Sequence, residues 1–108
     1  MITKSVEIYK LWHEFVPHFP KTSRYTLGSK IDASLIEIAE SILIASQTKK
    51  ELKLPHILHA STKLNLVKFF LQVTWEIKAI DGKKYIALST KLDELGRMLG
   101  GWIKQTVN

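Results

Sequence analysis

Apolar side chains recur every three to four residues along four segments of the chain, a period typical of α-helices that bury one face. In the first segment Ile8, Leu11, Trp12 and Phe15 form one stripe, and Pro17 follows soon after. Because proline cannot continue a helix interior, we predict a short helix that ends before it. No segment shows the strict alternation of a half-buried strand.

The second segment follows a proline-containing corner and runs from about residue 24 to about residue 46. Ser23 stands directly before it, and serine at this position favours an N-cap, so we predict Ser23 as the cap. Its apolar positions alternate between spacings of four and three residues: Leu27, Ile31, Leu35, Ile38, Ile42 and Ala45.

The third segment, from Pro55 to about Ile80, is apolar over most of its circumference. Its polar residues fall on one narrow strip, so the helix must be covered on more than one side. A chain of 108 residues has too few other helices to cover all of this surface. We therefore predict a subunit interface, since obligate interfaces resemble a core cut in two. The predicted interface residues are Leu66, Phe69, Phe70, Val73 and Trp75.

The fourth segment begins after the turn signal at Asp81 and Gly82. Its apolar residues keep the spacing of a helix-packing seam: Leu88, Leu92, Leu95, Leu99 and Trp102. Gly100 and Gly101 near its end either loosen the helix or admit a close neighbour. Three long helices and one short helix predict an all-α, up-and-down four-helix bundle.

Length and composition narrow the class of protein. The 108 residues suffice for one hydrophobic core, so we expect a single domain over residues 1–108. The absence of cysteine excludes disulfides and thiolate metal sites and agrees with a reducing compartment, so we expect a cytoplasmic protein. Glu7 precedes any long apolar run, and no run approaches about 18 apolar residues, so we expect neither secretion nor membrane association.

Residues able to support catalysis or metal binding are sparse. His56 and His59 have a ligand-like spacing of three residues, but the sequence offers no evident third ligand, so we predict no metal site. Glu37 and Glu40 lie one helical turn apart, which is more typical of a solvated acidic face than of a di-iron site. Phosphate-loop and nucleophile-elbow spacings do not occur. We therefore expect no catalytic residues, no cofactor and no enzymatic activity.

Positive charge gives the chain one distinctive property. Sixteen Lys and Arg residues against ten Asp and Glu residues leave a net charge of +6. The isoelectric point near 9.6 is in the range of nucleic-acid-binding domains. Repetition of this charge around an oligomer would create a continuous positive field that attracts polyanions.

Three runs of residues resemble one family closely. They are FPKTSRYTLGSKID at residues 19–32, FLQVTWEIKAI at residues 70–80 and KLDELGRMLGGWIK at residues 91–104. In this order and spacing they resemble the Avd-type accessory proteins of diversity-generating retroelements. The resemblance extends over nearly the whole chain. The broader superfamily of these accessory proteins includes proteins encoded in ribosomal-RNA intervening sequences.

This resemblance implies a four-helix bundle that assembles into a homopentameric barrel. It also implies a basic surface that binds nucleic acid and a reverse transcriptase during mutagenic copying of a template RNA into cDNA, without a catalytic site in the accessory protein. The expected partners are further copies of the chain, RNA, DNA or an RNA–DNA hybrid, and the reverse transcriptase. The alternative is an oligomeric structural or protein-interaction bundle, unrelated to a retroelement, that binds no nucleic acid.

On this interpretation, basic side chains along the chain contact nucleic acid. For two of them a structural role is open, because Arg24 and Arg97 are also placed to form ion pairs with Asp32 or Glu94. The predicted contacts are Lys21, Arg24, Lys30, Lys63, Lys68, Arg97 and Lys104.

Overall fold

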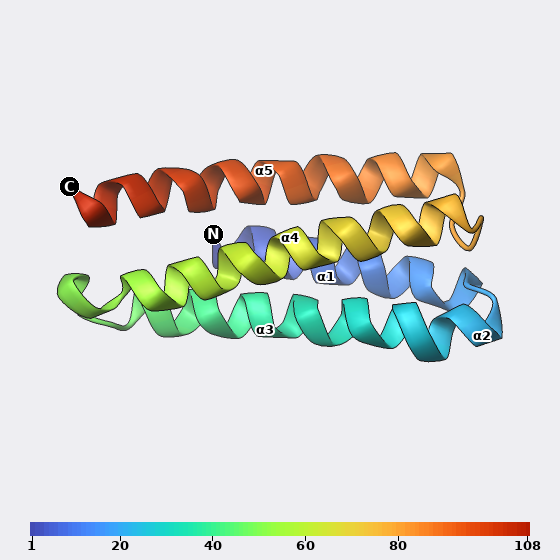
Figure 1. Ribbon diagram of the computed structural model, residues 1–108, viewed down its shortest axis with the longest axis horizontal. Coiled ribbons are helices and arrows are strands. Elements are labelled where there is room, and N and C mark those ends of the chain that lie inside the picture. Colours follow the sequence, from blue (N-terminus) through green and yellow to red (C-terminus); the bar gives the residue numbers. More distant parts are fainter.

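Four long helices run side by side along the major axis of the molecule, whose extents are 44 × 21 × 20 Å (Figure 1). The computed structural model describes residues 1–108 and contains no strand. The long helices are α1 (Ile2–Phe15), α3 (Ser29–Ser46), α4 (Leu54–Glu76) and α5 (Gly82–Val107). The prediction of an all-α four-helix bundle is confirmed.

Helices α1 and α4 occupy opposite corners of the bundle. Each of them packs against α3 and against α5. In Figure 1, α4 lies on the near side and α1 lies behind it. The apolar stripes predicted from the sequence meet between these helices in one cluster of 18 buried residues. Leu88, Leu92, Leu95 and Leu99 are all buried, as the seam on the fourth segment predicted.

Short helical turns connect α1 to α3. These are η1 (Val16–His18), α2 (Lys21–Ser23) and η2 (Arg24–Gly28), of which η2 is a π-helical turn that leads directly into α3. The prediction that Ser23 caps this helix is wrong. Helical geometry begins at Lys21, because Pro20 is extended and its carbonyl already accepts the Arg24 N–H at 2.9 Å.

Helix α4 ends at Glu76, whereas the sequence predicted a helix to about Ile80. A Schellman motif stops it. The Lys78 N–H donates to Trp75 O and the Ala79 N–H donates to Thr74 O, each at 2.9 Å. The motif requires a left-handed residue, which here is Lys78 with φ of 63°. The chain then turns back, so that Ala79 and Ile80 are buried without being helical.

A fourth short helical element, η3 (Lys50–Leu52), precedes α4, and Asp81 is the residue directly before α5. The Asp81 carboxylate accepts the Lys84 backbone N–H at 2.8 Å and its ammonium at 2.9 Å. These two hydrogen bonds hold the pKa of Asp81 below its ordinary value. The turn signal at Asp81 and Gly82 is therefore an N-cap with a defined bond.

Replacement of Lys78 by glycine tests the Schellman motif. Glycine adopts the left-handed conformation without a Cβ clash, so we expect Lys78→Gly to stabilise the fold by roughly 0.5–1 kcal/mol in urea unfolding. Lys10→Gly, in the exposed middle of α1, is the control and should destabilise by about 1 kcal/mol. A loss of stability in both variants would contradict the assignment of Lys78.

Candidate nucleic-acid interface

Arg24, one of the seven predicted nucleic-acid contacts, holds the corner between α1 and α3. Its Nη2 donates to the carbonyls of Pro17 at 2.8 Å and Phe19 at 3.2 Å, and its Nε is buried without a partner. The ion pair with Asp32 does not form. The guanidinium therefore satisfies backbone carbonyls where the chain turns, and we leave Arg24 out of the candidate interface.

Asp32 instead joins α3 to α1. Its Oδ1 accepts the Tyr9 hydroxyl at 2.8 Å and the Trp12 indole N–H at 3.1 Å. Hydrogen bonding to this carboxylate raises the pKa of Tyr9. Trp12 is fully buried and packs edge-on against Phe19, with ring centroids 5.3 Å apart.

Lys63 and Lys68, two further predicted contacts, form ion pairs on opposite sides of α4. Lys63 lies 2.9 Å from Glu37 of α3, and Lys68 lies 3.0 Å from Asp93 of α5. The hydrogen bond from Lys63 lowers the pKa of Glu37. Lys68 reaches α5 beside Gly96, where an added Cβ would stand 3.4 Å from the ammonium nitrogen. Both lysines therefore connect helices.

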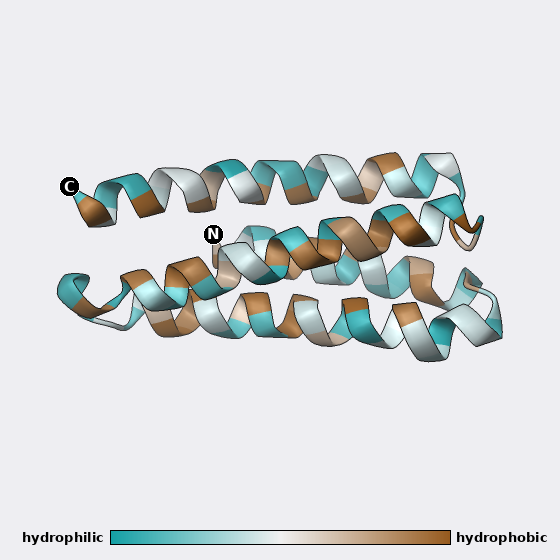
Figure 2. Ribbon diagram, in the orientation of Figure 1, coloured by the Kyte–Doolittle hydropathy of each residue, from teal (hydrophilic) through white to brown (hydrophobic).

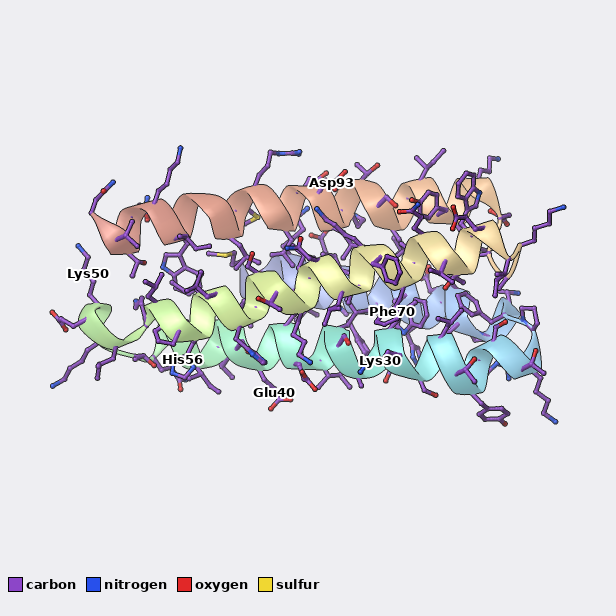
Figure 3. All side chains as sticks on the ribbon, in the orientation of Figure 1. Lys30, Glu40, Lys50, His56, Phe70 and Asp93 are labelled. Atoms are coloured by element: carbon purple, nitrogen blue, oxygen red, sulfur yellow. The ribbon has the colours of Figure 1, made fainter.

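The other four predicted contacts, Lys21, Lys30, Arg97 and Lys104, are exposed and form no ion pair. The ion pair between Arg97 and Glu94 does not form either, because the Glu94 carboxylate accepts a hydrogen bond from Lys4 of α1. Arg97 and Lys104 are seven residues apart, so they project from the same face of α5. Asp93, labelled at the upper edge in Figure 3, marks the direction of this face.

Gly100 and Gly101 lie on α5 between these two cations. The helix continues through both glycines to Val107, so they do not loosen its end. A Cβ added at either position would meet no atom within 4 Å. Each glycine costs a helix about 1 kcal/mol relative to alanine, and no contact within the chain requires the small residue. The backbone of α5 is therefore bare where Arg97 and Lys104 flank it.

Three more lysines gather at the end of the bundle that holds both η3 and the C-terminal turn of α5 (Figure 1). Lys53 places its ammonium 5.5 Å from the Trp102 ring centroid, a cation–π contact. Lys50, which is labelled at this end in Figure 3, and Lys53 line a shallow cavity of about 280 Å³ with Trp102. We call Lys49, Lys50, Lys53 and Lys104 the basic end.

The site prediction omitted Lys49, Lys50 and Lys53, although their clustering before Pro55 was visible in the sequence. Their proximity to Trp102 was not visible, because residues 53 and 102 meet only through the packing of α4 on α5.

The predicted oligomer interface lies mainly on one face of α4. Leu66, Phe69, Phe70 and Val73 follow one another at helical spacing, and the Phe69 side chain is 58% exposed. Figure 2 shows hydrophobic segments recurring along α4 on the side turned to the viewer. Trp75 points elsewhere and stacks on Tyr85 of α5, with centroids 5.0 Å apart and ring planes at 5°.

His56 and His59 meet the two glutamates of α3. Together with Glu37 and Glu40 they line a cavity of about 240 Å³, in which His59 Nε2 is 3.8 Å from the Glu37 carboxylate. No three of these or other acidic and histidine side chains are arranged to hold a metal ion. Glu37 is instead engaged by Lys63.

A comparison with protein families adds to this geometry. The family model described as bAvd-like matches residues 1–106. The chain belongs to the bAvd-like family. No protein with a curated function matches the sequence. Membership in the bAvd-like family indicates an accessory protein of a diversity-generating retroelement, and this family is not a known class of enzyme. None of the helices in this bAvd-like bundle is long and apolar enough to cross a membrane.

The corner of this bAvd-like bundle gives a test of the role of Arg24. Lysine keeps the charge but lacks the planar guanidinium whose Nη2 donates to both carbonyls, so we expect Arg24→Lys to destabilise by about 1–2 kcal/mol in thermal unfolding. Lys21→Ala, an exposed neighbour without a partner, should leave the melting temperature unchanged. Equal melting temperatures for Arg24→Lys and the parent protein would show that the two carbonyl bonds contribute nothing.

Proposed function

We propose that this protein is a non-catalytic accessory subunit of a diversity-generating retroelement that binds RNA, DNA or their hybrid and docks the reverse transcriptase during mutagenic cDNA synthesis. Membership in the bAvd-like family supports the retroelement context. In this proposal the polymerase supplies the chemistry, and the bundle supplies a charged surface that positions the nucleic acid.

The observation that supports nucleic-acid binding is that some basic side chains are paired with carboxylates and others are not. Lys63 and Lys68 on α4 are paired with carboxylates, whereas Arg97, Lys104 and the lysines around η3 have no carboxylate partner, and all of these except the half-buried Lys53 are exposed. Unpaired cations attract phosphates and release condensed counterions when they bind. If these unpaired cations had a structural role, they would instead form ion pairs with carboxylates of the same chain.

Gly100 and Gly101 fit the same proposal. Without side chains between Arg97 and Lys104, a phosphodiester backbone can approach the helix closely while both cations reach phosphate oxygens. The contacts are with the backbone of the nucleic acid, so we expect little dependence on base sequence.

Self-association multiplies this surface. We propose that the exposed apolar face of α4 contacts a neighbouring copy and that the copies form a homopentameric ring. Each copy adds a charge of +6, so a ring presents repeated basic faces to one nucleic acid.

Loss of single cations tests the interface on α5. We expect Arg97→Ala and Lys104→Ala each to weaken binding of a 20-base-pair RNA–DNA hybrid and to reduce the slope of log K against log salt by about one. Fluorescence anisotropy at several salt concentrations measures both quantities. Lys83→Ala is the matched control, because Lys83 is exposed and unpaired but lies at the opposite end of α5. An equal effect of all three variants would assign binding to net charge and not to this face.

The two glycines give a test in which stability and binding move in opposite directions. We expect Gly100→Ala and Gly101→Ala each to stabilise the fold by about 1 kcal/mol and to weaken hybrid binding, because the methyl group occupies the bare surface. Gly82→Ala is the control. A Cβ added at Gly82 also meets no atom within 4 Å, and this residue lies at the opposite end of α5. Unchanged binding in the Gly100 and Gly101 variants would contradict the close approach of the backbone.

A second candidate function is a protein-interaction bundle that binds no nucleic acid. The exposed apolar face of α4 favours it, because this surface suits a protein partner equally well. The hybrid-binding measurement decides between the two functions. An intact oligomer without affinity for the hybrid at physiological salt would support the interaction bundle.

A further inference from the structure

The bundle has two unlike apolar surfaces that the chain itself leaves uncovered. The first is a groove of about 500 Å³ between α1 and α3. Ile2 and Val6 form one wall, and Ile36 and Leu43 form the other. Val6 is 45% exposed and Leu43 is 48% exposed, so these large side chains are half in solvent. A groove with this lining favours an apolar occupant.

The second surface is a ridge on α4 formed by Leu66, Phe69, Phe70 and Val73. The spacing of these residues is i, i+3, i+4 and i+7, which is the pattern of a helix that lays its apolar side chains into a groove. Phe69 and Phe70 contact each other edge to face, with centroids 5.5 Å apart. Phe69 is the most exposed of the four, whereas Phe70 is half-buried against the core.

From these two surfaces we infer that the α4 ridge of one copy docks in the α1–α3 groove of the next copy. This inference rests on the proposed self-association and specifies its two surfaces. Because α1 and α4 occupy opposite corners of the bundle, the groove and the ridge are on different faces and can be occupied at the same time. The contact is therefore head to tail, which generates a ring when the rotation closes.

Charge on the two surfaces is complementary. The groove has two charged residues, Lys10 on its α1 wall and Glu40 on its α3 wall. Figure 3 shows Glu40 pointing away from the bundle, free to meet a neighbour. The ridge has one unpaired charge on its edges. Glu76 is exposed, lies seven residues after Phe69 and continues one edge, whereas Lys63 on the other edge is engaged by Glu37 of its own chain.

One orientation suits the charge on Glu76. When the ridge lies with its Glu76 edge toward α1, Glu76 meets Lys10, a charge of opposite sign. The reversed orientation places Glu76 beside Glu40, a like charge, and is disfavoured. The charge on Glu76 therefore fixes the direction of the contact.

Complementation between two variants tests the head-to-tail contact. Leu43→Asp blocks the groove, and Phe69→Asp blocks the ridge; both side chains are half exposed, so circular dichroism should show an intact helical fold. We expect an oligomer for the parent protein and a monomer for each variant alone in sedimentation velocity without nucleic acid. Mixed one to one at high concentration, the variants should form a dimer and no larger species, because one groove and one ridge remain.

Several results would overturn the inference. A parent protein that is monomeric by itself would assign the groove to a different partner. Oligomers in either variant alone, or a one-to-one mixture that stays monomeric, would show that the groove and the ridge do not meet. Lys10→Ala removes the charge on the α1 wall and should weaken assembly without abolishing it. Lys83→Ala is the control, because Lys83 is exposed on α5 outside the groove and the ridge, and it should leave assembly unchanged.

Cross-linking gives an independent readout, because the chain contains no cysteine. Val6→Cys labels the groove and Val73→Cys labels the ridge. A short bismaleimide should yield a covalent dimer from the mixture of the two variants and little dimer from either one alone. Efficient dimers from each variant alone would indicate a two-fold contact and contradict the proposal.

These readouts are separate from nucleic-acid binding. A parent protein that gives the complementation pattern but ignores the hybrid would contradict the proposed nucleic-acid function and leave the contact standing. A protein that binds the hybrid but assembles through other surfaces would contradict only the contact.

Discussion

The attachment of α1 to α3 through Asp32 is the contact on which the arrangement of the bundle depends. A single carboxylate oxygen accepts hydrogen bonds from Tyr9 and Trp12, and the buried Trp12 ring packs against Phe19 of the corner. Arg24 fixes the same corner from the other side by its bonds to two carbonyls. The C-terminal half of α1 is therefore firmly held, and its N-terminal half lies along the open groove.

Two groups among the positive charges of the chain have different physical roles. Cations next to a neighbouring helix are neutralised by carboxylates and fix the position of α4 between α3 and α5. Cations at the basic end and on the outer face of α5 have no such partner. A net charge of +6 alone does not distinguish the groups, because the distinction arises only when the helices are packed.

Much of the fold was predictable because helical periodicity is a local property of the sequence. The stripes on the second and fourth segments identified buried residues such as Ile38 and Leu95 correctly. The end of α4 was not predictable in this way, since a lysine took the left-handed position that usually belongs to glycine. The candidate site was less predictable than the fold. The pairing of Lys68 with Asp93 and the stacking of Trp75 on Tyr85 both depend on contacts between helices.

The pairing of Lys63 and Lys68 has a consequence for the proposed assembly and nucleic-acid binding. With these ammonium groups neutralised, the apolar face of α4 can approach a second basic copy without strong repulsion, and its burial depends little on ionic strength. The unpaired cations respond steeply to salt. In the proposed ring, a rise in ionic strength would therefore weaken the binding of a polyanion and leave the contact between subunits intact.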